Sequence, residues 1–175
     1  RPAAGGDWMV VDPGQGAVPL PGGAAAELSG ITWTGGNAFL VVGDNGGPLV
    51  ELTVDLDSAD GSIITANFGA ATDIAGSDLE GLAFQPSTGN VFVSDEAGPQ
   101  IRIHQPASGA QVGSVAVPPV FAAIRPNLSL EALAWDAAGG FLWTANEEAL
   151  SVDGPVSSLA AGTVVRLQRF GADLA

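Results

Sequence analysis

The sequence contains no cysteine, and its only histidine is His104. Without cysteine there can be no disulfide, thiolate nucleophile, iron–sulfur cluster or cysteine-bound zinc. A single histidine excludes metal sites built from several histidines, and a Ser-His-Asp triad would have to use this one residue. His104 lies in the alternating run 101–104, so we expect it to be a solvent-facing strand residue instead.

Positive charge is also scarce. The chain has 5 Lys plus Arg, all of them arginine, against 19 Asp plus Glu, for a net charge of −14. No basic surface is available to neutralise phosphates, so we expect neither nucleic-acid binding nor attraction to anionic membranes. No apolar run is long enough to span a bilayer. A hydrophobic content of 46% nevertheless predicts a buried core.

The length of 175 residues suits one compact domain or about half of a larger one. The chain begins at Arg1, without an initiator methionine or an apolar signal segment. We therefore expect a processed or excised part of a longer protein, from which any targeting signal has been removed.

Two motifs repeat with a period of 51 residues. The first occupies residues 27–33, 78–84 and 129–135. The second occupies residues 42–45, 93–96 and 144–147, and at the same period it aligns Asp44 with Asp95 and Asn146. Two separate motifs that keep one period indicate a repeat architecture.

Short β-type runs, separated by glycine and proline, fill each repeat. They are 39–42, 49–54 and 62–64 in the first repeat, 82–84, 91–94, 101–104 and 111–115 in the second, and 141–144 and 163–167 in the third. About four strands per repeat are typical of β-propeller blades, whereas a sandwich would not repeat two motifs at constant spacing. We predict an all-β fold of about three four-stranded blades over 27–175, with repeats starting near 27, 78 and 129, after an N-terminal strand (8–11) and linker in 1–26.

Three blades do not close a ring, because propellers typically have four to eight. The open edges would be an aggregation hazard unless they are covered. We expect the remaining blades to come from the same protein or from another subunit, including a second copy of this chain.

Acidic residues recur at one end of each predicted blade. A Glu80-type residue precedes the first strand, and the pair Asp95 and Glu96 ends the second, so antiparallel pairing places them on one rim. Clustered carboxylates repel unless a cation compensates them, and oxygen-only ligands suit Ca²⁺ better than Mg²⁺. The candidate ligands are Asp44, Glu80, Asp95, Glu96, Glu131 and Glu147. The alternative is that these acids cap turns by accepting backbone N–H bonds.

Two further features have ordinary structural interpretations. Residues 55–61 resemble the beginning of a calcium loop, but a hairpin closed by Asp60 and Gly61 explains them without a metal. Trp33, Phe84 and Trp135 also repeat every 51 residues. They could form a stacking platform for sugars, but we expect them to be core between blades.

Five segments occur in an order that resembles a known family. They are 28–31, 78–83, 94–96, 125–134 and 146–150. Together they resemble the phytase-like domain family, described as having esterase-like activity of phytase, over about 27–170. The resemblance implies a secreted or periplasmic bacterial β-propeller that is longer than this chain, and it implies hydrolysis of phosphate esters.

Three functions remain open at this point. The first is a calcium-dependent phosphoesterase acting on a phosphorylated small molecule, with Glu80 and Glu131 as ligands or general base and Arg125 contacting a phosphate oxygen. The second is a non-catalytic extracellular propeller that binds a ligand or partner. The third is a structural subunit that assembles through its open blade edges. Calcium-dependent release of phosphate would distinguish the first from the other two.

Overall fold

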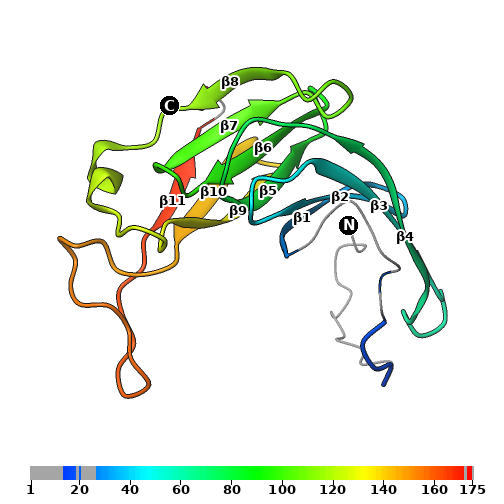
Figure 1. Ribbon diagram of the computed structural model, residues 1–175, viewed down its shortest axis with the longest axis horizontal. Coiled ribbons are helices and arrows are strands. Elements are labelled where there is room, and N and C mark those ends of the chain that lie inside the picture. Colours follow the sequence, from blue (N-terminus) through cyan, green and yellow to red (C-terminus); the bar gives the residue numbers. More distant parts are fainter. Residues whose placement is uncertain (1–13, 19, 21–26, 172, 175) are drawn as a thin grey trace.

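The computed structural model describes residues 14–18, 20, 27–171 and 173–174. The strand expected at 8–11 lies outside the described residues. Within the described part, three antiparallel sheets follow one another around an arch, with one short 3₁₀ helix, η1 (Pro119–Ala123) (Figure 1). No helix in this part of the chain is long and apolar enough to cross a membrane.

Each sheet is a meander in which consecutive strands pair, as in a propeller blade. Blade 1 contains β1 (Leu28–Gly35), β2 (Ala38–Gly43), β3 (Leu49–Leu56) and β4 (Ile63–Thr72). Blade 2 contains β5 (Leu79–Gln85), β6 (Asn90–Asp95), β7 (Gln100–His104) and β8 (Gln111–Val115). Blade 3 contains β9 (Leu130–Asp136), β10 (Phe141–Asn146) and β11 (Leu167–Phe170). The predicted all-β fold of propeller blades is confirmed.

The last strand of blade 3 differs from the prediction. A strand was expected over 163–167, but β11 begins only at Leu167, and blade 3 has three described strands instead of four. Side-chain bonds hold the preceding backbone. The N–H of Arg166 donates to Asn146 Oδ1 (2.8 Å), and the Arg166 guanidinium pairs with Asp153 at 2.6 Å. Residues 147–166 therefore form a connection, here called the arm, that projects from the sheets (Figure 1).

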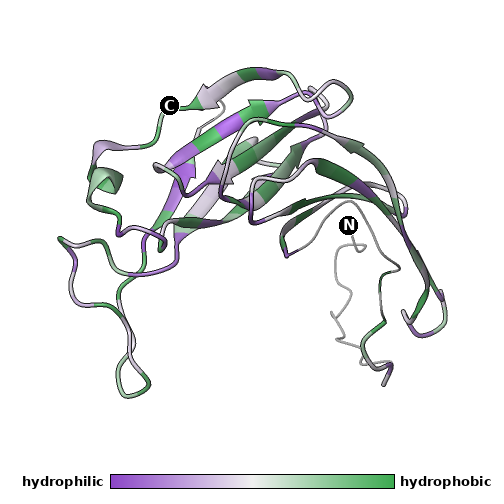
Figure 2. Ribbon diagram, viewed as in Figure 1, coloured by the Kyte–Doolittle hydropathy of each residue, from purple (hydrophilic) through white to green (hydrophobic). Residues whose placement is uncertain are grey.

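Apolar side chains join the blades, and hydrophobic residues run along much of the strands (Figure 2). Between blades 1 and 2 the core contains Leu40, Val42, Leu49, Leu79, Leu82, Val91 and Val93. Between blades 2 and 3 it contains Phe92, Ile101, Leu130, Leu142 and Phe170, with Phe121 from η1. Burial of these side chains at roughly 25 cal/mol per Å² is what holds successive sheets face to face.

The first strands of the three blades, β1, β5 and β9, lie next to one another. Their close approach depends on glycine. A Cβ on Gly30 would collide with the carbonyl oxygen of Glu80, and one on Gly81 would lie 2.8 Å from the carbonyl oxygen of Glu131. Ala132 occupies the third equivalent position and is exposed. This packing brings together the beginnings of β5 and β9, where Glu80 and Glu131 stand.

The repeated aromatic residues are not uniformly core. Trp135 is partly buried and stacks on Phe92 with ring centroids 5.7 Å apart, as expected for core between blades. Trp33 is 60% exposed, and its indole N–H donates to the carbonyl of Gly36 (2.9 Å). With Phe84 the two tryptophans line a groove of about 380 Å³ on the first strands. The groove is open because no sheet in the described part covers it.

Two other sequence interpretations can be compared with the structure. His104 was expected to face solvent, but it is fully buried, with Nδ1 2.9 Å from the carbonyl oxygen of Gly109. The backbone oxygen that approaches its ring comes from the turn between β7 and β8. The hairpin interpretation of 55–61 is confirmed. Asp57 and Asp60 accept backbone N–H bonds within the turn between β3 and β4, and Gly61 has a positive φ of 77°.

Candidate metal centre at the acidic rim

Backbone hydrogen bonds show which rim residues are equivalent in the three blades. In each blade the N–H at the end of the second strand donates to the carbonyl of the residue before the first strand. The three bonds are Asp44 to Glu27 (2.9 Å), Glu96 to Asp78 (2.8 Å) and Glu147 to Ser129 (2.9 Å). Asp44 is therefore equivalent to Glu96 and Glu147. The sequence alignment of Asp44 with Asp95 and Asn146 was wrong by one residue.

The difference arises in the first hairpin. Gly35 pairs with Ala38, which leaves a two-residue turn, whereas Gln85 pairs with Asn90 across a four-residue turn. A register irregularity between Trp33 and Gly35 recovers one residue. Blade 1 is thus one residue shorter at this turn. Because side chains alternate between faces of a strand, an offset of one residue reverses which acid faces the rim.

Asp95 lies on the other face for this reason. It is 1% exposed, and its Oδ2 accepts bonds from Nη2 (2.8 Å) and Nε (3.2 Å) of Arg102 in β7. Its Oδ1 accepts the backbone N–H of Ala97 (3.1 Å), which is the turn-capping arrangement considered above. The structure therefore commits the predicted ligand Asp95 to an ion pair and a turn.

Four of the predicted ligands do come together, and a fifth acid joins them. One carboxylate oxygen from each of Glu80, Glu96 and Glu131 lies within 4.8 Å of the others. Asp44 and Asp78 form a second such group with Glu80, which is common to both. Asp78 was missed, although it opens the second repeat immediately before β5. We call these five residues the acidic rim. Glu147 belongs to neither group, but its charge acts on Glu96 and Glu131.

Hydrogen bonds between blades position the acidic rim. The Glu96 carboxylate in blade 2 accepts the backbone N–H of Ser129, directly before β9. The carbonyl of Asp44 in blade 1 accepts the N–H of Leu79 (3.0 Å), which begins β5. Each carboxylate is thus fixed relative to the next blade, so the geometry of the cluster depends on the packing between blades.

The environment of the rim disfavours ionised carboxylates. Burial, followed by repulsion from Glu80, Glu96 and Glu147, raises the pKa of Glu131 from 4.5 to about 7. Burial also raises the pKa of Glu80, where the hydrogen bond from Ser29 partly offsets it. The pKa values of Glu96 and Asp78 are raised as well, mainly by burial. A bond between Glu131 and Glu96 favours the proton on Glu131.

The described arginines do not form ion pairs with these acids. Arg102 pairs with Asp95 and Arg166 with Asp153, while Arg169 lies 4.4 Å above the Phe141 ring. Ionisation of the acidic rim therefore lacks a compensating side-chain ion pair within the described part of the chain.

The donor set fits a divalent cation. Ca²⁺ takes oxygen ligands at 2.3–2.6 Å, so two of its ligands can be up to about 5 Å apart. The carboxylate oxygens of each rim group, all within 4.8 Å, meet this condition.

Arg125 lies next to the acidic rim but has a structural role there. Its Nε donates to the carbonyl of Ala149 (3.0 Å) and its Nη2 to that of Gly154 (2.7 Å), which anchors the arm. Arg125 also lines a pocket of about 480 Å³ that Asp78 and Glu96 line as well. This rim pocket lies between the turn after β6 and the segment that leads from η1 toward β9.

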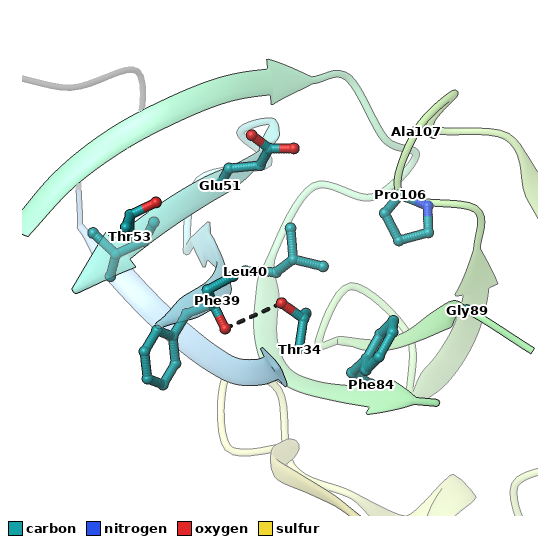
Figure 3. A pocket seen from close by; sticks show the side chains of 11 residues that line it. Thr34, Phe39, Leu40, Glu51, Thr53, Phe84, Gly89, Pro106 and Ala107 are labelled. Carbon is teal, nitrogen blue, oxygen red and sulfur yellow. Dashed lines mark hydrogen bonds between the residues drawn. The ribbon is translucent and has the colours of Figure 1, made fainter. Parts of the chain in front are cut away.

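A different cavity, of about 420 Å³, lies between blades 1 and 2 (Figure 3). Phe39, Leu40, Phe84 and Pro106 form its apolar walls, and Glu51 contributes its only carboxylate. None of the acidic rim residues lines it. The titratable cluster and this cavity are therefore separate features.

A family model described as "Phytase-like: Esterase-like activity of phytase" matches residues 24–173. The chain belongs to this phytase-like family. No curated protein matches it. Among solved structures, a luciferin-regenerating enzyme is similar at 17% sequence identity, with a TM-score of 0.48, over 82% of this chain and 45% of that chain. The phytase-like chain thus spans less than half the length of that protein.

Proposed function

We propose that this phytase-like chain is part of a calcium-dependent phosphoesterase whose site is the acidic rim. The observation that carries the proposal is the convergence of Glu80, Glu96 and Glu131, three carboxylates from two blades with no ion-pair partner among the described residues. The family description, which refers to esterase-like activity of phytase, supports hydrolysis of phosphate esters.

The five rim carboxylates would hold the cation. When bound, calcium supplies positive charge that attracts a phosphate group and lowers the pKa of a water molecule. Mg²⁺ suits the rim less well, because it requires tighter octahedral geometry. A protein of charge −14 repels a phosphate ester in bulk. Activity should therefore depend strictly on the divalent cation.

Glu131 is the best candidate for proton transfer. Its pKa of about 7 leaves it partly protonated at neutral pH, where a general base or acid works best. Its bond with Glu96 keeps the proton on the Glu131 carboxyl until the environment changes. Glu80, shared by both carboxylate groups, has the position of a ligand that links them.

Release of phosphate from phytate and from an aryl phosphate tests this proposal, with calcium added and then chelated while the melting temperature is recorded. Turnover that requires calcium supports the esterase, and Glu80→Gln and Glu131→Gln should abolish it. Glu51→Gln is the matched control, because Glu51 is an exposed glutamate outside the acidic rim. Turnover that persists in chelator would contradict the proposal.

A second candidate is a non-catalytic, calcium-stabilised propeller that binds a ligand or partner outside the cell. The role of Arg125 favours it, because two of its N–H groups already bind the arm. A calcium-dependent rise in melting temperature without turnover would select this function. For either function we propose an exported protein, as the resemblance implies, whose ring is completed by further blades from the same protein or another subunit.

A further inference from the structure

The rim pocket has two chemically different sides. Asp78 and Glu96 of the acidic rim line one side, and Arg125 stands among the other lining residues. The rest of the lining is small and largely apolar, and includes Ala97, Pro99, Ala122, Ile124 and Pro126. A ligand that fills this pocket therefore meets the proposed cation site at one place and an uncharged wall elsewhere.

This lining does not suit a substrate with many phosphates. Phytate carries a phosphate on every carbon of its ring, and each would need positive charge or hydrogen-bond donors. The pocket offers one arginine, and two of the five N–H groups of its guanidinium are bound to carbonyls of the arm. The remaining phosphates would face apolar side chains or carboxylates, which is unfavourable.

We propose that the rim pocket receives the leaving group of a phosphate monoester whose alcohol is small and apolar or aromatic. The inference rests on the proposed function. In the reaction, a water oxygen forms a bond to phosphorus, the ester P–O bond breaks, and a water proton ends on the alcohol oxygen. The products are inorganic phosphate and the free alcohol. A volume of about 480 Å³ accommodates a group the size of a phenyl ring.

Ala122 is the residue with which to test the pocket. It is exposed, and it belongs to η1 rather than to a strand, so a larger side chain can enter the pocket without disturbing a blade core. Ala122→Trp should block the pocket. Ala116→Trp is the matched control, because Ala116 is also exposed on the connection between β8 and η1 but does not line the pocket.

Two measurements on the full 175-residue chain test the assignment. In calorimetry with calcium present, phenylphosphonate, which cannot be hydrolysed, should bind about tenfold more tightly than methylphosphonate. In hydrolysis assays, kcat/KM should be higher for phenyl phosphate than for methyl phosphate or phytate. Ala122→Trp should remove the preference for phenyl in both assays, while Ala116→Trp keeps it.

The outcomes separate the pocket from the reaction. If phytate is the better substrate, or if both tryptophan variants behave alike, the pocket assignment is overturned and the proposed hydrolysis stands. If no ester is hydrolysed but phenylphosphonate keeps its preference and loses it in Ala122→Trp, the pocket assignment is supported and the proposed hydrolysis is overturned. Equal binding of the two phosphonates by the unmodified chain overturns the pocket assignment.

Discussion

Glu131→Gln should stabilise the protein at alkaline pH when no divalent cation is present. The pKa of Glu131 is raised from 4.5 to about 7, so between these values the folded state binds more protons than the unfolded state. The free energy of unfolding should therefore fall as the pH rises from about 4.5 to 7 and stay low above it. Glutamine cannot ionise, so the variant avoids this loss.

The expected size follows from the pKa and from the exposure of the side chain. The full difference between the two pKa values would correspond to about 3.4 kcal/mol. Glu131 is only partly buried, so solvent screening reduces the effect to about 1 kcal/mol. For a chain of this length, that is a rise in Tm of about 2–4 °C at pH 8.

Thermal unfolding followed by circular dichroism, in chelator at pH 5 and pH 8, measures this difference. The variant should exceed the unmodified protein at pH 8 and differ little from it at pH 5. Calcium at pH 8 should reverse the order, because the cation stabilises the carboxylate that the variant lacks. A variant that is less stable than the unmodified protein at pH 8 in chelator would refute the reasoning that the ionised rim is uncompensated. Glu51→Gln, outside the rim, should show no such pH dependence.

Three other substitutions test the register, the blade packing and the arm. Asp95→Asn leaves Arg102 without its charged partner and should cost about 2 kcal/mol of stability, with calcium affinity within about twofold of normal; Glu96→Gln should instead weaken calcium binding about tenfold in calorimetry, and the opposite pattern would show that our register is wrong. Gly30→Ala should lower the free energy of unfolding in denaturant by about 1–3 kcal/mol, because its Cβ meets the Glu80 carbonyl, whereas exposed Ala132→Gly should cost less than about 1 kcal/mol; equal costs would contradict the close approach of the first strands. Hydrogen bonds from the side chain and backbone of Ser157 lower the pKa of Glu148 below 4.5, so this stabilisation is present above about pH 4.5 and is lost as the pH falls through the lowered value; Glu148→Gln should therefore speed amide exchange over 150–165 relative to the unmodified protein at pH 7 but not near pH 3, and an equal ratio at both would exclude the role of the charge.

The sequence by itself determined the blade architecture. The period of 51 residues gives strands β1, β5 and β9 their starts at Leu28, Leu79 and Leu130, and the run 111–115 coincides with β8. These features are local, because alternating apolar residues and Gly or Pro turns specify a strand wherever the chain is placed. The concentration of acids at one rim also followed from the motifs, since antiparallel pairing puts the end of one strand beside the start of the previous one.

Only the tertiary structure decided which acids face one another. Whether Asp95 or Glu96 joins Glu80 depends on a one-residue difference in the first hairpin, and either residue is an acid in the sequence. The burial of His104 and the capture of Arg125 by the arm likewise depend on segments distant in the chain, or on a turn whose path the composition does not specify. Burial and repulsion, which raise the pKa of Glu131, exist only when neighbouring blades bring Glu80 and Glu96 against it. Strand pattern is a property of neighbouring residues, whereas the chemistry of the rim is a property of distances that packing alone creates.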